Sequence, residues 1–231
     1  ADNAYHVLVF NGGTALGSNS SANITPATVL NGVTVEAGYA DALEPTDPKA
    51  KGAGLFCDGM GTGNACSVQI SRVIVEANEA DALGGGIYVT ASSGGTSRLT
   101  VTQSTLTNNI AEQGGALYYR GVDADGSAGG ELTVIESAFT NNVGRDYGGA
   151  IHMISSGGET ASQLNVRRST FSGNVGSSGG GALYHDVRID ATSATEIINS
   201  VFTDNRSGLG GGAVFNDARS GGTSELRILN S

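Results

Sequence analysis

Leu132-Thr-Val134, Phe139-Thr-Asn-Asn142 and Gly148-Gly-Ala-Ile151 form the stretch that decides the fold. In it, an apolar residue is followed three positions later by Asn, and a Gly-rich segment then leads into another apolar strand. The same order recurs six times, and successive apolar positions lie 40, 31, 33, 32 and 31 residues apart. The pairs are Val35/Gly38, Val75/Asn78, Leu106/Asn109, Phe139/Asn142, Phe171/Asn174 and Phe202/Asn205. A period of about 32 residues predicts a solenoid.

Apolar and polar residues alternate upstream of each pair, as in Leu99-Thr-Val101 and Leu164-Asn-Val166. A period of two indicates short strands rather than helices. Such strands cannot bury an apolar face alone, but they can if each pairs in parallel with its counterpart one coil away. The sequence therefore predicts an all-β fold, a right-handed parallel β-helix of six to seven coils of about 32 residues. Residues 1–231 form a single segment of it, and residues 44–51 form an inserted loop that accounts for the one longer spacing.

Aligned columns of the repeat suggest structural roles. The apolar members of the pairs, and a second column after the glycines, are expected to stack as interior ladders. The second column is Leu55, Ile87, Leu117, Ile151, Leu183 and Val214. The Asn column predicts a tight corner, because Asn tolerates left-handed backbone and its side chain can bond along the stack. Its members are Asn78, Asn109, Asn142, Asn174 and Asn205, and a parallel Ser column comprises Ser104, Ser137, Ser169 and Ser200. The paired glycines permit sharp bends or close backbone approach.

Composition excludes several classes of protein. Glycine makes up 37 of 231 residues, but three prolines and the lack of a Gly-X-Y period exclude collagen. An apolar share of 39% argues against disorder, and no apolar run is long enough to span a membrane. Twelve basic and 22 acidic residues give a net charge of −10. This balance argues against nucleic acid as a partner and against docking on anionic lipid.

Cys57 and Cys66 are separated by turn-forming residues, so their side chains can meet as a loop-closing disulfide. The alternative is a pair of unbonded buried thiols. The disulfide is the favoured interpretation, and it indicates an oxidising, extracytoplasmic setting. The spacing does not match a zinc-type cysteine pair.

The Phe-x-x-Asn and Gly-Gly-Ala-Ile motifs resemble the repeats of polymorphic outer-membrane proteins, a family of autotransported bacterial adhesins. The stretches Asn3–Val7 and Thr28–Val35 also resemble "choice-of-anchor" surface proteins, whose β-helical repeats precede an anchoring region. The resemblance runs from about Asn3 to Ser231 and implies a scaffold at the cell surface, without implying an activity. Gly38 departs from the Asn column, and the sequence shows no anchoring region. Because Glu225–Ser231 matches the opening of another coil, we expect the chain to be part of a longer protein.

Parallel β-helices also include polysaccharide lyases and glycoside hydrolases, which require a cluster of acidic and basic side chains. The best cluster is on two neighbouring predicted strands and the coil after them; it comprises Arg167, Arg168, His185, Asp186, Arg188, Asp204 and Arg206. Surface charge at strand edges is the favoured interpretation, and no catalytic residue is assigned.

The sequence contains only incomplete patterns of metal ligands. Asp123-Ala-Asp125-Gly126 lacks the later ligands of a calcium loop, so a solvated turn is preferred. The Asp58–Asn64 loop offers oxygen atoms for calcium, with no further pattern in its support. No metal or cofactor is assigned.

An aromatic stripe follows the second interior ladder by one residue, so alternation places it on the outside of the coil. Its members are Phe56, Tyr88, Tyr118, His152, Tyr184 and Phe215. Such a stripe could stack on sugar rings or dock a protein. The alternative is a packing ladder covered by loops such as Asp123–Gly130 and Ser155–Thr160.

The expected function is that of a non-catalytic, extracellular or cell-surface stalk or adhesin, which mediates display, attachment or assembly. The alternative is a carbohydrate-active β-helix, either a glycan-binding module or a lyase. A glycan or a protein surface is the expected ligand, and end-to-end self-assembly is a third hypothesis. No nucleic-acid partner and no direct insertion into a membrane are expected.

Overall fold

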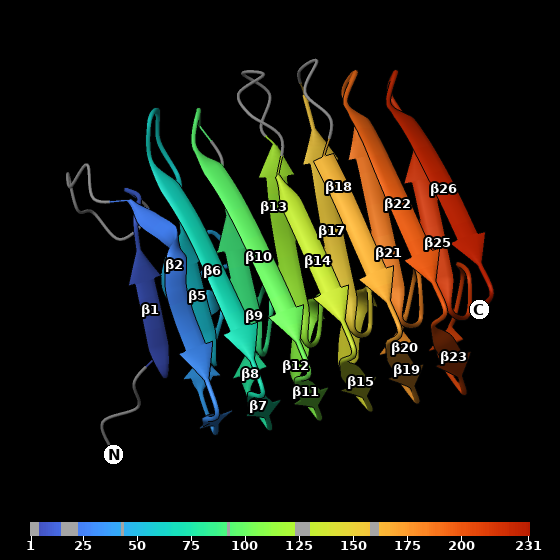
Figure 1. Ribbon diagram of the computed structural model, residues 1–231, viewed down its shortest axis with the longest axis horizontal. Coiled ribbons are helices and arrows are strands. Elements are labelled where there is room, and N and C mark those ends of the chain that lie inside the picture. The colour runs from blue at the N-terminus through green and yellow to red at the C-terminus, as the bar shows by residue number, and fades with distance from the viewer. Residues whose placement is uncertain (1–4, 15–22, 43, 92, 123–129, 158–161) are drawn as a thin grey trace.

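The computed structural model describes residues 5–14, 23–42, 44–91, 93–122, 130–157 and 162–231. All regular structure in this part of the chain is β-strand, apart from one short 3-10 helix, η1 (Pro48–Ala50). The strands form four parallel sheets that run along one common axis (Figure 1). The all-β parallel solenoid is therefore confirmed.

The first and second sheets contain seven strands each. The first consists of β1 (Leu8–Asn11), β5 (Leu55–Asp58), β9 (Ile87–Thr90), β13 (Leu117–Val122), β17 (Ile151–Ser156), β21 (Leu183–Arg188) and β25 (Val214–Ala218). The second consists of β2 (Ile24–Asn31), β6 (Ala65–Ser71), β10 (Thr96–Thr102), β14 (Glu131–Ile135), β18 (Ser162–Arg167), β22 (Thr192–Ile198) and β26 (Thr223–Leu229).

The third and fourth sheets contain six strands each. The third consists of β3 (Thr34–Glu36), β7 (Ile74–Glu76), β11 (Thr105–Thr107), β15 (Ala138–Thr140), β19 (Thr170–Ser172) and β23 (Val201–Thr203). The fourth consists of β4 (Tyr39–Ala40), β8 (Glu79–Ala80), β12 (Ile110–Gln113), β16 (Val143–Tyr147), β20 (Val175–Gly176) and β24 (Arg206–Ser207).

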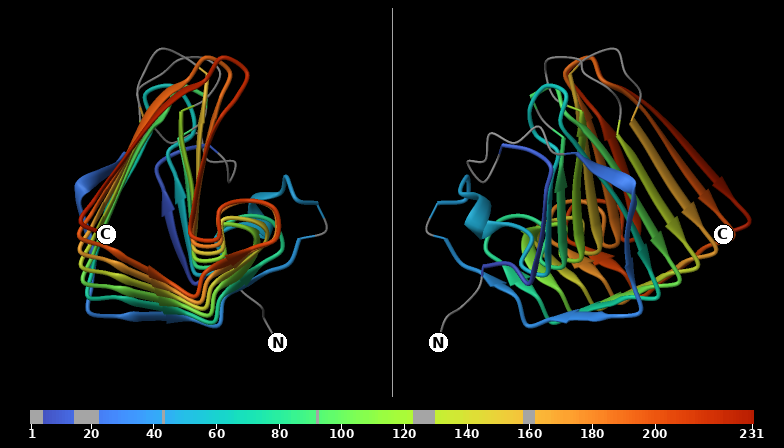
Figure 2. Two further views of the ribbon diagram at one scale, coloured as in Figure 1. Left: turned by 90° about the vertical axis from the view of Figure 1, so that its right-hand side faces the viewer. Right: turned by 60° about the vertical axis from the view of Figure 1, so that its left-hand side comes forward.

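One strand from each sheet makes up a coil, and the regular part contains about five turns of about 32 residues each. The first coil contains the insertion and is longer than the others. The number of regular turns is therefore slightly smaller than the six to seven coils predicted. Seen from the C-terminal end, the chain turns anticlockwise as it approaches the viewer (Figure 2). The β-helix is therefore right-handed, as parallel strand crossovers almost always are.

The cross-section has a large compartment and a small side lobe (Figure 2). Large apolar side chains from the first three sheets fill the large compartment, and both predicted ladders lie there. Within it, Phe171 stacks between Phe139 and Phe202, with ring centroids 4.8 and 4.7 Å apart. The small lobe is closed by the fourth sheet, and a cluster of small buried apolar residues lies there, Ala40, Ala53, Ala80 and Ala111.

The Asn column forms a continuous ladder at the corner between the third and fourth sheets, buried from Asn78 to Asn174. The Oδ1 atom of Asn142 accepts hydrogen bonds from the backbone N–H and the Nδ2 of Asn109, both at 3.0 Å. Its Nδ2 donates to the carbonyl of Leu106 at 2.9 Å and to Oδ1 of Asn174 at 3.0 Å. The same pattern links Asn78 to Asn109 and Asn174 to Asn205. Each amide thus satisfies buried backbone groups and the next amide in the stack.

The left-handed conformation at this corner falls one residue before the Asn column, not on it. Positive φ angles occur at Ala77, Asn108, Asn141, Gly173 and Asp204. The column residues themselves point inward to bond along the stack, so the turn is made by the residue that precedes them. The Ser column repeats this arrangement at the corner between the second and third sheets. For example, Ser137 accepts from the backbone N–H of Ser104 at 3.1 Å and follows Glu136, whose φ is 49°.

The two glycines of each Gly-Gly-Ala motif meet different requirements. Gly114 has a φ of 65°, in the left-handed region that favours glycine. Gly115 has no positive φ, but a Cβ there would lie 2.4 Å from the carbonyl oxygen of Gly149 and 2.5 Å from that of Val143. A side chain at Gly115 would therefore collide with the next coil.

Replacing Asn142 by Ala should strongly destabilise the fold. The substitution leaves the buried backbone N–H of Asn109 without its acceptor and removes one donor from the carbonyl of Leu106. We expect a loss of about 3–5 kcal/mol in the free energy of unfolding, measured by urea denaturation. The control is Asn165→Ala on the outer face of β18, which should change stability by less than about 0.5 kcal/mol. Equal effects of the two substitutions would show that the ladder adds nothing beyond packing.

Candidate functional site

The aromatic stripe lies on the outer face of the first sheet, as alternation predicts, and its rings contact each other from coil to coil, stacked at most steps and edge-on between Tyr118 and His152. Successive ring centroids from Phe56 through Tyr88 to Tyr118 are 5.1 and 5.5 Å apart, and both pairs are stacked. The series continues through His152 and Tyr184 to Phe215 at 5.2, 4.8 and 5.4 Å. The structure therefore brings the six predicted rings into one file along the axis.

This stripe is covered rather than open. Its first five side chains are buried, with at most 6% of the residue exposed, whereas Phe215 is half-buried. Residues of the segment that closes the small lobe lie against them and pair from coil to coil, at Lys51, Leu83, Gln113, Tyr147 and Gly179. The two loops predicted as the cover, 123–130 and 155–160, lie largely outside the described residues. The geometry favours packing for these five rings, and a binding role for the stripe stays a prediction.

Tyr147 and Leu83 also belong to this outer cluster, in addition to the residues predicted from the sequence. Tyr147 stacks on Tyr184 at 5.1 Å, and Leu83 packs against the cluster of Phe56, Tyr88, Tyr118 and Ile154. Both residues directly precede a pair of glycines in the sequence. A column at this position of the repeat could therefore have indicated them.

His152 behaves as an apolar ring within the stripe. It is fully buried, and neither of its ring nitrogens has a hydrogen-bond partner among the described residues. Burial lowers the pKa of His152 to about 3, although the nearby Asp186 carboxylate acts in the opposite direction. The ring is therefore neutral at physiological pH and lies between aromatic neighbours.

The predicted charged cluster is not assembled. His185 and Asp186 are neighbours in β21 and so face opposite sides of the first sheet. Arg167 pairs with Glu196 at 2.7 Å on the second sheet, and Arg168 pairs with Glu136 at 2.9 Å at a corner. Asp204 makes the turn at the other corner, and Arg206 lies on the fourth sheet in β24. Of the seven residues, only Asp186 and Arg188 form an ion pair with each other.

His185 belongs to a polar group inside the β-helix. Its ring nitrogens lie 2.9 Å from the hydroxyl of Ser193 and 2.6 Å from that of Thr195. Burial lowers the pKa of His185 to about 4, against the opposing effect of Asp186. The ring is therefore neutral and hydrogen-bonded across the interior.

Asp186 is a buried carboxylate held by two arginines. Its Oδ2 accepts hydrogen bonds from Nε of Arg188 at 2.6 Å and from Nη2 of Arg219 at 2.7 Å. Burial would raise the pKa of Asp186, but the hydrogen bonds and charges of both arginines outweigh it and lower that pKa. This cluster is a structural ion pair on the outer face of the first sheet.

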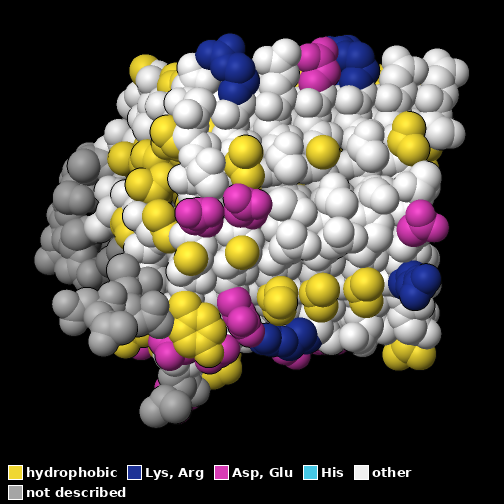
Figure 3. All heavy atoms as spheres, turned by 90° about the horizontal axis from the view of Figure 1, so that it is seen from below, with side chains coloured by type: hydrophobic (Ala, Val, Ile, Leu, Met, Phe, Trp, Pro, Cys, Tyr) yellow, Lys and Arg dark blue, Asp and Glu magenta, His cyan; other side chains and the backbone are white. Residues whose placement is uncertain are grey.

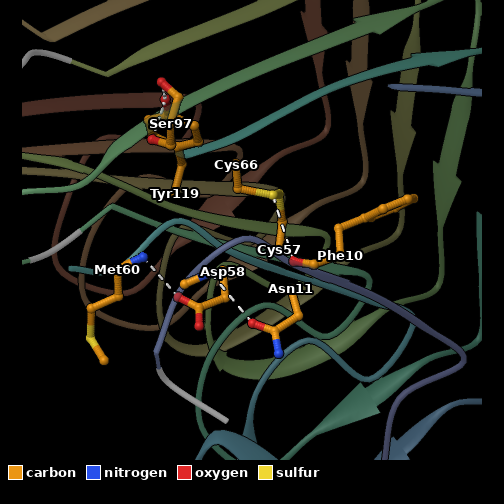
Figure 4. The surroundings of a disulfide bond; sticks show 9 residues. Phe10, Asn11, Cys57, Asp58, Met60, Cys66, Ser97 and Tyr119 are labelled. Carbon is orange, nitrogen blue, oxygen red and sulfur yellow. Dashed lines mark hydrogen bonds between the residues drawn. A yellow bond between two sulfur atoms is a disulfide. The ribbon is translucent and has the colours of Figure 1, made fainter. Parts of the chain in front are cut away.

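Cys57 and Cys66 are joined by a disulfide that crosses the interior between β5 and β6 (Figure 4). Both cysteines are fully buried. The loop between them is closed by its own hydrogen bonds, since Asp58 Oδ1 accepts from the backbone N–H of Met60 and Asn64 Nδ2 donates to the Met60 carbonyl, both at 2.8 Å. Two oxygen atoms of the loop that were candidate calcium ligands, Asp58 Oδ1 and the Met60 carbonyl oxygen, therefore accept hydrogen bonds within the loop.

Metal ligands do not converge in the part of the chain that the structure describes. No group of three or more His, Cys, Asp or Glu side chains within it could hold a metal ion. The segment Asp123–Gly126 lies outside the described residues. Within the same limits, no helix has the length and apolar character needed to cross a bilayer.

Two segments of the chain, residues 168–186 and 199–217, match the Chlamydia polymorphic membrane protein repeat. Each runs from the corner before the Ser column, through the Phe and Asn columns, into the first sheet. The chain resembles the polymorphic membrane proteins in both sequence and fold. This repeat is consistent with a surface-exposed β-helical segment like an autotransporter passenger, and with an outer-membrane or cell-surface location. No curated protein and no solved structure shows significant similarity to the chain.

Neutralising Asp186 should destabilise the protein in a pH-dependent manner. Asp186→Asn leaves two arginines without their carboxylate, so we expect a loss of about 1–3 kcal/mol at neutral pH, less than for a fully buried pair because both arginines are partly exposed. Because the pKa of Asp186 is lowered in the folded protein, ionised Asp186 stabilises the fold at pH values above 3.8, the ordinary pKa of this group. This stabilisation is lost as the pH falls below that value. The difference in the free energy of unfolding between wild type and variant should therefore become smaller at acidic pH, as measured by urea denaturation at a series of pH values.

Glu196 provides a matched control, because it also lies between two arginines, Arg167 and Arg227, but on an exposed surface. Glu196→Gln should lower the free energy of unfolding by less than about 1 kcal/mol. A similar cost for both substitutions at neutral pH would contradict the role assigned to the buried position of Asp186.

Reduction of the Cys57–Cys66 disulfide should lower the free energy of unfolding by about 2–3 kcal/mol without abolishing the fold. The bond restricts the unfolded chain over a short loop, whereas the remaining coils keep their own stacking. Denaturation with and without a phosphine reductant measures the effect, and the Cys57→Ala/Cys66→Ala double variant should not respond to the reductant. An unchanged stability in protein whose thiols are shown to be free would refute this expectation.

Proposed function

We propose that this chain is a non-catalytic, surface-displayed β-helical segment that mediates attachment. The polymorphic membrane protein repeats are the observation that carries the proposal, because they connect this rod to proteins of a bacterial surface. Three further features of the described residues support it. They are the uninterrupted stacking of the coils, the dispersal of the charged cluster, and the closure of most of the aromatic stripe.

The broad face formed by the third and fourth sheets suits contact with another surface (Figure 3). Its outward side chains on successive strands of the third sheet are mostly small and uncharged. They include Thr105, Thr107, Thr140, Thr170, Ser172 and Thr203. Short hydroxyl side chains on a flat sheet lose little conformational entropy when they are covered, and they can both donate and accept hydrogen bonds.

Surface display can be tested on intact cells that produce the full-length protein. We expect an antibody against residues 5–231 to label these cells without permeabilisation, and external protease to remove the label. Labelling that requires permeabilisation would contradict the surface location.

Attachment requires a separate experiment with the purified chain. Beads coated with it should adhere to glycan-bearing or cell surfaces more strongly than beads coated with a Phe139→Asp variant. That substitution puts an unpaired charge into the interior ladder and should disrupt the coil. Equal adhesion of both bead types would argue against an adhesive role for the folded rod.

A further inference from the structure

A depression on the outer face of the second sheet forms around Ala194. It has a volume of about 240 Å³ and lies across the neighbouring strands β18, β22 and β26 (Figure 1). In one outward column, Ala194 lies between Gln163 of the preceding coil and Glu225 of the following coil. Two long side chains therefore flank a single methyl group, and this difference in length leaves the hollow.

The next outward column supplies the other wall of the depression. Asn165, Glu196 and Arg227 lie in register on the same three strands, two residues further along each, and all three line the hollow. Residues two apart on a strand point to the same side of the sheet, so both columns face the solvent. The depression therefore presents two side-chain amides, two carboxylates and one guanidinium group to a ligand.

The carboxylate of Glu196 is held from both sides before any ligand arrives. Its Oε2 accepts a hydrogen bond from Nη2 of Arg167 at 2.7 Å, and its Oε1 accepts one from Nη1 of Arg227 at 3.2 Å. A carboxylate held in this way loses less conformational entropy on binding than a free glutamate side chain. Each oxygen still has a lone pair for a further donor.

Three other polar side chains of the depression keep their hydrogen-bonding capacity for a ligand. Within the part of the chain that the structure describes, the side chains of Gln163, Asn165 and Glu225 make no hydrogen bond or ion pair with another residue. Each amide can both donate and accept, whereas the ionised carboxylate only accepts. A ligand that pairs with all three therefore needs several groups that both donate and accept, as hydroxyl groups do.

The charges around the depression balance. Glu196 and Glu225 carry two negative charges, and two arginines oppose them, Arg167 and Arg227. Because these side chains reach the solvent, a net charge on the ligand would gain little. Among the described residues that line the hollow, Ala194 is the only one with an apolar side chain, so an aliphatic or aromatic ligand would bury little apolar surface. The lining favours a polar, uncharged ligand.

A sugar ring matches this set of groups better than an amine does. A ligand with a single ammonium group would reach Glu225 but leave both amides without partners. A pyranose ring carries hydroxyl groups on successive carbon atoms, so neighbouring hydroxyls can donate to the carboxylate and pair with the amides. The volume is below the roughly 300–1,000 Å³ typical of pockets for drug-sized ligands, so the hollow suits one monosaccharide.

We propose that the depression around Ala194 binds a neutral pyranose residue of a glycan through adjacent hydroxyl groups. These hydroxyls donate to Glu225 and Glu196, and the amides of Gln163 and Asn165 bind the remaining ones. The inference deepens the proposed function and rests on it, because a surface-displayed rod would meet glycans on the surface to which it attaches. Without an aromatic ring to stack on, one sugar should bind with a dissociation constant on the order of 1 mM.

Titration of the purified chain with the methyl glycosides of D-glucose, D-galactose and D-mannose, followed by nuclear magnetic resonance, tests the proposal. At least one glycoside should shift the side-chain amide resonances of Gln163 and Asn165. The side-chain amide of Gln103, which donates to Glu136 on an exposed surface away from the hollow, should not shift. Failure of all three glycosides to shift Gln163 and Asn165 would overturn the proposal.

Filling the hollow should weaken binding without unfolding the protein. Ala194→Gln places a long side chain in it, and the preceding coil already has a glutamine, Gln163, at the equivalent position. We expect at least about tenfold weaker binding of the glycoside and an unchanged midpoint of urea denaturation. The matched control is Ser67→Gln, which introduces the same residue into the same outward column but outside the hollow. Equal weakening by both variants would overturn the proposal.

Removing the charge of Glu225 tests the contact with the hydroxyl groups. Glu225→Gln keeps the size of the side chain but replaces a charge-assisted hydrogen bond, so binding should weaken at least about threefold. The matched control is Glu131→Gln, in the same outward column but outside the hollow, which should leave the affinity unchanged. An unchanged affinity in Glu225→Gln would contradict the assigned contact.

Two further probes separate a sugar from other small ligands. Tetrahydropyran-2-methanol keeps the ring but lacks the ring hydroxyls, and propylammonium offers only a cation. Binding of either probe as tightly as the best glycoside would overturn the assignment. Failure of glycoside binding while coated beads still adhere would refute this inference and leave the proposed function standing; glycoside binding by a protein that is absent from the cell surface would do the reverse.

Discussion

The buried amide at the corner between the third and fourth sheets is the interaction on which the other features of this β-helix depend. A chain that turns sharply in its interior buries backbone groups that cannot all reach a neighbouring strand. The side chain of Asn109 meets this need by donating to the carbonyl of Val75 at 2.9 Å, while its Oδ1 accepts from the backbone N–H of Asn78 at 3.2 Å. Because each amide also bonds the next one, the ladder aligns every coil with its neighbour.

That alignment determines which residue types are compatible with every other position of the coil. A shift of one residue would move each interior side chain to the opposite face of its sheet. With the register held, glycine is required where coils approach within backbone contact, as at Gly115, and large apolar residues can fill the main compartment. The high glycine content is therefore a consequence of ordered stacking.

The narrow edge between the first and second sheets shows that one structural position can be stabilised by different chemistries. In one coil Cys57 and Cys66 are covalently joined. In the columns that continue from them, the Tyr119 hydroxyl lies 2.7 Å from that of Ser97, and the His185 ring lies 2.9 Å from the Ser193 hydroxyl. Further along, Ser224 donates to Asn216 at 2.9 Å. These contacts link the two sheets where little apolar volume is available.

The repeat made most of the fold predictable, because strand positions, interior ladders and the Asn column are all periodic properties of the sequence. Predictions that required a neighbour in space were less complete. Alternation correctly placed the aromatic stripe outside the first sheet, but it did not show that Tyr147 and Leu83 come from the small lobe to pack against it. The spacing of the charged residues likewise did not show that His185 and Asp186, adjacent in sequence, face opposite sides of one strand.

The 44–51 insertion illustrates the same division. Sequence identified residues 44–51 as an insertion and located both lysines in it, but not the surface on which it lies. The structure brings Lys51 to Arg120, which is 69 positions further along the chain, and places both beside Tyr88. In this rod the interior columns repeat from coil to coil, whereas the outward columns vary. One outward column of the second sheet consists of Ser67, Arg98, Glu131, Gln163, Ala194 and Glu225. The interior period therefore does not determine the outer surface, because outward side chains can differ from coil to coil without disturbing the stacking.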